Sequence, residues 1–199
     1  MTARTLLILA IAALQGCAGT GVYKPEYLGD PPRFYGEPLA GRALLYVSPQ
    51  DRDYVFVGGP KTLVGSAVTV TLPLGRYVPD VGKEAIADFF SDGVELVEDV
   101  SVAGREPTIQ VRVADFAYRY ELLTISAVFI DMRLDVTLFD PDGRSLWSDT
   151  YRADEHRVQV KCPATRPYEC VNKAAHVTLF DLMYKAGSGV RNYRYSQAR

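Results

Sequence analysis

The chain has 199 residues, of which 48% are hydrophobic, and its formal net charge at neutral pH is −2. An apolar content near one half is typical of a globular protein with a hydrophobic core, and the length fits a single domain. The slightly acidic balance argues against a nucleic-acid partner, because electrostatic binding to nucleic acid requires a basic surface.

The first sixteen residues predict an export signal. Arg4 supplies a positive charge, and an unbroken apolar run follows over residues 6–14. This run is too short to span a bilayer, which takes about 20 apolar residues. It ends in Leu14-Gln-Gly-Cys17, which resembles the lipobox of bacterial lipoproteins. The resemblance implies cleavage before Cys17 and attachment of lipid to its thiol.

Lipid on Cys17 would anchor the protein to a membrane. Each buried CH₂ contributes about 0.8 kcal/mol to membrane binding, so two or three acyl chains such as palmitate hold the protein on the membrane durably. The alternative is an ordinary secreted protein with a chance cysteine at this position. By the same resemblance, Ala18 in place of an aspartate implies the periplasmic face of the outer membrane.

The segment after the leader predicts a tether. Four prolines and four glycines lie between residues 18 and 39 and disfavour regular structure. Semi-extended at about 3.1 Å per residue, the segment would reach roughly 70 Å. Its tyrosines and Phe34 suggest that part of it lies along the domain. We therefore expect a signal peptide over 1–16, a lipidated tether over 17–40 and one periplasmic domain over 41–199.

In the first half of the domain, apolar stretches at 42–48 and 54–57 flank the polar residues 49–53 and predict a leading hairpin. Alternating β-branched residues over 64–72 predict a strand. One apolar face over 79–92 predicts a helix that Gly93 ends.

In the second half, a strand is predicted over 108–120. The alternation changes phase there, which indicates a bulge near Ala114 and Asp115. Residues 128–138 alternate throughout, and 145–153 return antiparallel after an Asp-Pro-Asp-Gly turn. A second helix is predicted from Asn172 to Ala186, with glycines 187 and 189 ending it and a basic, aromatic tail after it.

From residue 64 the order is β-α-β-β-β-α. This order predicts an α+β fold: a two-layer sandwich with a mostly antiparallel sheet, a leading hairpin, and two helices packed on one face. The opposite face, which carries Asp131, Arg133, Asp135 and Thr137, would be wet.

Cys162 and Cys170 predict a disulfide, because the periplasm is oxidising and two prolines lie in the loop between them. The alternative is a metal site formed with His156 and His176. The seven-residue spacing of the cysteines is wider than the two to four residues usual in zinc sites. We therefore expect no metal and no other cofactor.

The lipobox, tether and β-α-β-β-β-α order resemble small envelope lipoproteins of the YajG-like kind and the lipopolysaccharide-assembly lipoprotein. The likeness is carried mainly by Pro107–Tyr151, where an Ile-x-Val-x-Val strand and a long alternating strand lead through Leu138-Phe-Asp-Pro-Asp-Gly-Arg-Ser-Leu-Trp147. It implies a non-enzymatic role in envelope assembly or transport, and it carries over no site residue beyond Cys17.

Catalytic motifs are lacking in the sequence. It has no Gly-x-Ser-x-Gly elbow, no His-Glu-x-x-His and no phosphate-binding loop. Asp131 and Asp135 share a strand face but would lie about 13 Å apart, too far for a glycosidase pair. We therefore expect that the protein is not an enzyme.

The features that suggest binding are weaker. Arg191, Tyr193, Arg194 and Tyr195 could contact anionic lipid, lipopolysaccharide or peptidoglycan, or a partner. The alternative is a tail whose tyrosines pack on the sheet. Tyr118-Arg-Tyr120 favours cross-strand packing over a ligand platform, and edge strands could pair with a partner chain.

The sequence therefore predicts an outer-membrane lipoprotein that acts as an accessory or scaffold through contact with an envelope protein. The alternative function is a periplasmic auxiliary lipoprotein that binds lipid or glycan.

Overall fold

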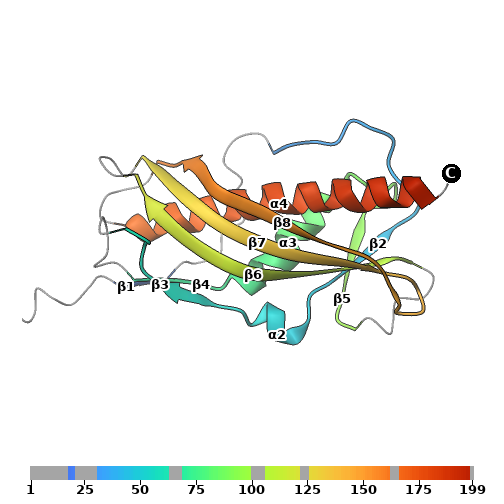
Figure 1. Ribbon diagram of the computed structural model, residues 1–199, viewed down its shortest axis with the longest axis horizontal. Coiled ribbons are helices and arrows are strands. Elements are labelled where there is room, and N and C mark those ends of the chain that lie inside the picture. Colours follow the sequence, from blue (N-terminus) through green and yellow to red (C-terminus); the bar gives the residue numbers. More distant parts are fainter. Residues whose placement is uncertain are drawn as a thin grey trace, which may run out of the picture.

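The computed structural model describes residues 18–20, 31–62, 69–99, 106–121, 126–161 and 166–197. In chain order the elements are β1 (Ala18–Thr20), β2 (Ala43–Tyr46), α2 (Pro49–Arg52), β3 (Phe56–Gly58), β4 (Thr69–Leu72), α3 (Leu74–Ala87), β5 (Val94–Val97), β6 (Thr108–Tyr120), β7 (Ala127–Phe139), β8 (Ser145–Gln159) and α4 (Pro167–Gln197) (Figure 1).

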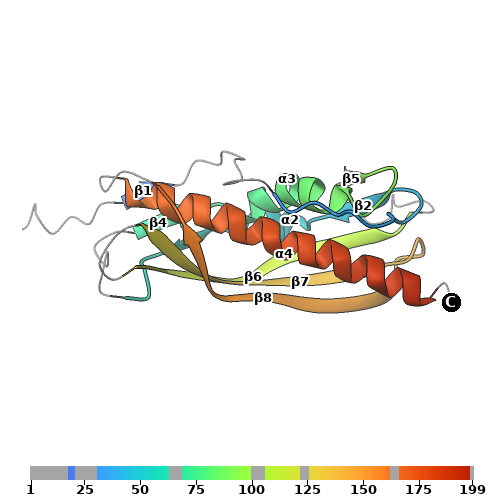
Figure 2. The same cartoon turned by 90° about the horizontal axis from the view of Figure 1, so that it is seen from above.

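The main sheet has five strands in the order β5-β2-β6-β7-β8. Strand β2 runs parallel to both β5 and β6, whereas β6, β7 and β8 form an antiparallel meander. Helices α3 and α4 cover one face of this sheet, which Figure 2 shows edge-on. The predicted two-layer α+β fold is confirmed. None of the helices in the described residues is long and apolar enough to cross a membrane.

Strand β7 shows why the sheet has one buried face. Every second side chain from Val128 to Leu138 is buried against the helices, and the residues between them are half-buried. Such strict alternation places all the apolar side chains on one face of a strand. The core is formed where this face meets Tyr77, Val81 and Ile86 of α3 and the buried stripe of α4.

The predicted bulge in β6 is confirmed. The register with β7 shifts between Val113 and Asp115. Since the shift inserts one residue, Val113 before it and Phe116 after it both lie on the buried face.

The predicted leading hairpin is wrong. Strand β2 pairs with β5 and β6, and β3 pairs with β4 instead. The residues expected as a turn form the short helix α2, because Ser48 caps it by accepting a hydrogen bond from the backbone N–H of Asp51 at 3.1 Å. The partner of β2 at the sheet edge is β5, a four-residue strand that was not predicted.

Helix α3 starts and ends earlier than predicted. It begins at Leu74 and encloses Pro79, which was expected at its first turn. A proline there removes one backbone hydrogen bond, but Tyr77, Val78 and Val81 around it are fully or almost fully buried. The helix ends at Ala87, and Gly93, with φ of 73°, lies in the turn that leads to β5.

Helix α4 is much longer than predicted, because the glycines at 187 and 189 do not end it. A Cβ atom at Gly187 would lie 2.6 Å from the ring of Phe89, and one at Gly189 would overlap the hydroxyl of Tyr151. These glycines therefore permit close packing, and the expected tail up to Gln197 is helical.

A second, small sheet has the order β1-β4-β3 and lies at one end of the molecule, opposite the turn that joins β7 to β8 (Figures 1 and 2). In it, β1 runs parallel to β4, with Ala18 opposite Thr69.

Part of the segment expected as a tether packs on the domain. Phe34 lies against Phe89 with ring centroids 4.7 Å apart, and the backbone N–H of Leu39 donates to the Phe89 carbonyl at 2.9 Å. Tyr184 of α4 donates from its hydroxyl to the carbonyl of Arg33 at 3.1 Å. Residues 31–40 are thus attached to the segment that follows α3 and to α4.

Candidate functional site

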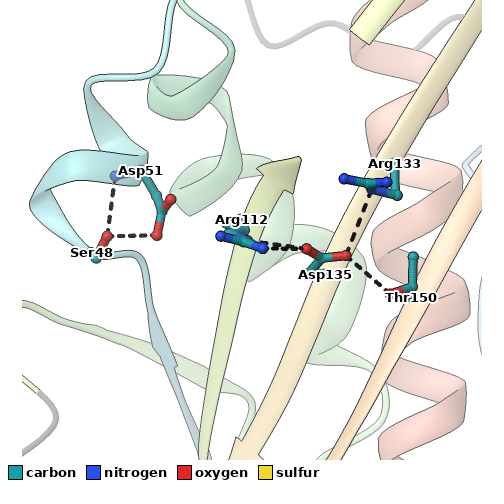
Figure 3. A network of polar contacts seen from close by, with 6 residues as sticks. All are labelled: Ser48, Asp51, Arg112, Arg133, Asp135 and Thr150. Carbon is teal, nitrogen blue, oxygen red and sulfur yellow. Dashed lines mark hydrogen bonds and ion pairs between the residues drawn. The ribbon is translucent and has the colours of Figure 1, made fainter. Parts of the chain in front are cut away.

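The face of the main sheet opposite α3 and α4 holds a polar network (Figure 3). Arg112 of β6 donates to Asp135 Oδ2 on β7 from Nη2 at 2.7 Å and from Nε at 3.1 Å. The Thr150 hydroxyl on β8 donates to Asp135 Oδ1 at 3.0 Å, and Arg133 Nε lies 3.9 Å from that oxygen. Asp135 therefore links three neighbouring strands.

The pocket beside this network has a volume of about 280 Å³. Residues of α2, β6 and β7 line it: Asp51, Gln110, Arg112, Asp135 and Thr137. Asp51 is oriented by Ser48, whose hydroxyl donates to its carboxylate at 2.5 Å. The network is thus an open, polar surface.

A second cluster on the same face is centred on Asp131 of β7. Lys61 Nζ donates to Asp131 Oδ2 at 2.7 Å, and the backbone N–H of Glu155 donates to Oδ1 at 2.6 Å. Arg119 pairs with Glu155 at 3.3 Å and stacks over the ring of Phe129 at 3.6 Å from its centroid. Lys61, which follows β3 in the chain, was not predicted from the sequence, because it reaches this cluster through a tertiary contact.

The electrostatics of both clusters favour ionised carboxylates. Partial burial opposes ionisation of Asp131, but hydrogen bonds from Lys61 and the Glu155 N–H outweigh it and lower the pKa of Asp131. Burial likewise opposes ionisation of Asp135, and hydrogen bonds from Arg112 and Thr150 again lower its pKa. Neither carboxyl is held protonated at neutral pH, so neither is suited to act as a general acid.

A groove of about 450 Å³ lies between the end of β8 and α4. Its walls are mainly apolar and include Pro32, Ala153 and Leu182, and the charged residues Asp154, Asp181 and Lys185 also line it. His156 lies in the groove, with Nδ1 3.0 Å from the Thr178 hydroxyl and Nε2 3.7 Å from Asp181 Oδ2. The His156 ring is half-buried against α4.

Three of the four side chains predicted to bind an anionic ligand make contacts within the chain. Arg191 Nε donates to the Glu37 carbonyl at 3.0 Å, and its guanidinium lies over the rings of Phe34 and Tyr195 at 4.6 and 4.5 Å. The Tyr195 hydroxyl donates to the same carbonyl at 3.3 Å. These two side chains hold residues 34–37 against α4.

Tyr193 stacks on Trp147 of β8 with ring centroids 6.1 Å apart. Arg194 is exposed and borders a pocket of about 380 Å³, together with Arg42 and Pro107. Arg42 is already paired with Glu95 and Glu106. The contact of Arg194 with an anionic ligand or a partner stays a prediction.

Tyr118 and Tyr120 are buried, as the packing interpretation predicted. Their rings meet edge to face at 5.5 Å, and the Tyr120 hydroxyl donates to the Pro167 carbonyl at 3.2 Å. Burial raises the pKa of Tyr120 to about 12. These tyrosines belong to the core.

Cys17 and Cys162 lie outside the described residues. Cys170 is fully buried near the start of α4, and its disulfide with Cys162 stays a prediction. His176 is 3% exposed, and burial lowers its pKa. Across the described ranges, no three His, Cys, Asp or Glu side chains gather as metal ligands.

Strand β8 forms one edge of the main sheet and is 15 residues long. Its register with β7 is interrupted near both ends. The backbone N–H of Thr150 donates to Asp149 Oδ1 at 2.8 Å. Bulges and charged side chains limit the pairing of sheet edges with other chains. Strand β8 has such features, and its pairing with a partner chain stays a prediction.

The chain matches no known protein-family model and no curated protein. Among solved structures, it is similar to a Xanthomonas campestris protein described under the family name DUF330, over 90% of this chain and 98% of that one, with 12% identity and a TM-score of 0.50. A minor lipoprotein from Acinetobacter baumannii aligns over 82% and 96% of the two chains, with 13% identity and a TM-score of 0.40. A PelC dodecamer from Paraburkholderia phytofirmans aligns over 79% and 96%, with 13% identity and a TM-score of 0.40. At 12% identity, the first likeness indicates a shared fold.

Proposed function

We propose that this protein is a lipoprotein of the bacterial envelope, held at the periplasmic face of the outer membrane by lipid on Cys17. It acts without catalysis, as an accessory or scaffold in envelope assembly or transport, through contact with another envelope protein. The anchor is supported by the leader and by the lipobox-like Leu14-Gln-Gly-Cys17. We also propose that the protein resembles the YajG-like and lipopolysaccharide-assembly lipoproteins in this role.

The proposed mode of action rests on the face of the main sheet opposite α3 and α4. It presents side chains from three adjacent strands, with Arg112, Asp135 and Thr150 fixed to one another by hydrogen bonds. Fixed polar groups lose little conformational entropy when a partner binds them. A face of this kind suits recognition of a folded protein surface.

The same observation argues against a catalytic role for this face. Charged groups that neutralise one another stabilise a surface, whereas a general acid or base needs a perturbed pKa near the working pH. The lowered pKa values of Asp131 and Asp135 move away from that range.

Photocrosslinking in cells tests the proposal. A photoreactive amino acid replaces Thr137, which is half-buried beside the polar network, on the sheet face opposite α3 and α4. The matched control places the same residue at Lys83, which is exposed on α3 on the other side of the molecule. We expect one membrane-fraction protein to be crosslinked from position 137 and not from 83. The proposal fails if neither position captures a protein, or if both capture the same set.

The groove beside His156 favours a second candidate function, in which the protein is an auxiliary lipoprotein that binds lipid or glycan. Its volume of about 450 Å³ falls within the range of small-ligand pockets, and its walls are mainly apolar. Organic extraction of the purified soluble domain, residues 18–199, followed by mass spectrometry tests this candidate. A stoichiometric lipid would support it, and the absence of any bound lipid or glycan would count against it.

A further inference from the structure

We infer that the outer face of the small sheet lies against the lipid bilayer, so that the domain stands on its β1-β4-β3 end. The inference rests on the proposed lipidation of Cys17. It adds an orientation, which the anchor alone does not give, because a long tether would let the domain take any orientation.

The proposed anchor directly precedes the small sheet in the chain. Strand β1 begins at Ala18, one residue after the proposed lipidated cysteine, and runs beside β4 in the register Ala18–Thr69, Gly19–Val70 and Thr20–Thr71. Adjacent Cα atoms are 3.8 Å apart along the chain. Lipid on Cys17 would therefore insert within a few ångströms of this sheet rather than at the end of a long tether.

The outer face of the small sheet carries exposed apolar side chains. Val57 of β3 is 64% exposed and Val55, just before it, is 44% exposed. Both values are high for large hydrophobic side chains, which a folded domain usually buries. In the register with β4, Val57 lies opposite Thr71, so the face presents valine and threonine side chains.

The alternate residues of the same strands point into the protein. Phe56 packs on Phe116 with ring centroids 4.8 Å apart, and Leu72, opposite Phe56, is fully buried. The exposure of the valines is thus not caused by a loosely packed strand. Phe56 packs β3 against the core, while Val57 of β3 and Val55 just before it face outward.

The strand residues on the outer face of the small sheet are uncharged. Lys61, the nearest basic residue after β3, is paired with Asp131 at 2.7 Å. Apolar residues beside an acyl anchor fit the boundary between the head groups and the acyl chains. A bilayer surface therefore suits this face better than an acidic or basic protein partner does.

The orientation leaves the proposed recognition face accessible. The turn between β7 and β8 lies at the opposite end of the molecule from the small sheet (Figures 1 and 2). The β7–β8 turn would point away from the membrane. The sheet face opposite α3 and α4 would extend between the two ends of the molecule.

Site-directed fluorescence tests the inference on the full-length mature lipoprotein, reconstituted in vesicles of phosphatidylethanolamine and phosphatidylglycerol. Val57→Cys is labelled with an environment-sensitive fluorophore. Leu146→Cys is the matched control, since Leu146 is also an exposed apolar residue (37%) and follows the distant β7–β8 turn. Unsubstituted protein, treated in parallel, measures any labelling of the native cysteines.

We expect the label at position 57 to shift its emission to shorter wavelength and to be quenched by spin-labelled lipid, with neither change at position 146. Thr69→Cys, exposed on the neighbouring strand, provides a second position and should behave like 57. If intact mass shows lipid on Cys17 while the labels at 57 and 69 stay in water, the inference fails and the proposed function stands. If Cys17 carries no lipid, the proposed function and the inference both fail, whatever the labels report.

Discussion

The carboxylate of Asp131 accepts a hydrogen bond from the backbone N–H of Glu155 at 2.6 Å. The two residues lie where the register of β7 and β8 shifts, between Ile130 and Met132. Glu155 has φ of 49°, an uncommon conformation for a residue with a side chain. A bulge leaves one backbone group without its ladder partner, and Asp131 supplies that partner while it also binds Lys61.

We predict that Asp131→Asn lowers the free energy of unfolding by about 0.5–1.5 kcal/mol at pH 7, because it removes the charge that pairs with Lys61. The pKa of Asp131 is lowered in the folded protein. A carboxylate of this kind stabilises the fold above its unfolded pKa of about 3.9, and the contribution is lost as the pH falls through the folded pKa. Urea unfolding at pH 7 and below pH 4 should therefore show a difference that disappears in acid.

Asp142→Asn, in the exposed β7–β8 turn, is the control and should change stability by less than about 0.5 kcal/mol. Equal stability of Asp131→Asn and the unsubstituted protein at pH 7 would contradict the assigned role of Asp131.

His176 should make the protein less stable in mild acid. The ring is 3% exposed, and burial lowers its pKa below the ordinary value. The unfolded chain therefore binds a proton before the folded chain does, so stability is lost as the pH falls below about 6.5. Between pH 7.5 and 5.5 we expect the unsubstituted protein to lose roughly 1 kcal/mol more than His176→Gln. Parallel pH profiles would contradict this assignment.

Gly75 in the first turn of α3 should not tolerate a side chain. A Cβ atom there would overlap the carbonyl oxygen of Asp51 and lie 2.6 Å from that of Arg52. Backbone atoms cannot rotate away, so Gly75→Ala should cost about 1–3 kcal/mol despite the better helix propensity of alanine. Gly82→Ala is the comparison, because its Cβ would meet the flexible ends of Met183 and Leu45. Thermal unfolding should show the larger loss at position 75, and the reverse order would refute the packing argument.

Arg191 should hold residues 31–40 on the domain. Arg191→Ala removes the hydrogen bond to Glu37 and the stacking on Phe34. We expect faster hydrogen exchange and faster proteolysis within residues 31–40, with little change in the sheet. Arg194→Ala is the matched control, since Arg194 lies on the same helix and is exposed. Identical exchange in both variants would argue against a clamp at Arg191.

Strong periodicity made parts of this fold predictable. Strand β7 alternates without interruption, and the phase change in β6 located its bulge to within a residue, because burial on one face fixes the side-chain pattern. The strands that pair with β2 could not be predicted from the periodicity of the sequence. These strands, β5 and β6, are parallel and distant in sequence, and local turn signals report only on neighbouring segments.

The end of α4 was predicted wrongly for a related reason. Gly187 and Gly189 fit a helix end by composition, but their role is to admit Phe89 and Tyr151, which no local pattern reveals. The same holds for the polar clusters. The acidic positions 131 and 135 were visible as a wet face, whereas the partner Lys61 comes from 70 residues earlier in the chain.

The proposed function and the proposed orientation on the membrane both require lipid at Cys17. Intact-mass and N-terminal peptide analysis of the protein extracted from bacterial membranes tests this directly, with Cys17→Ser as the control. We predict a mature chain that begins at Cys17 and carries a diacylglyceryl group with two or three acyl chains in all, and a Cys17→Ser variant that is neither lipidated nor cut at this position. A membrane-extracted chain with an unmodified Cys17, or with a different N-terminus, would contradict the account.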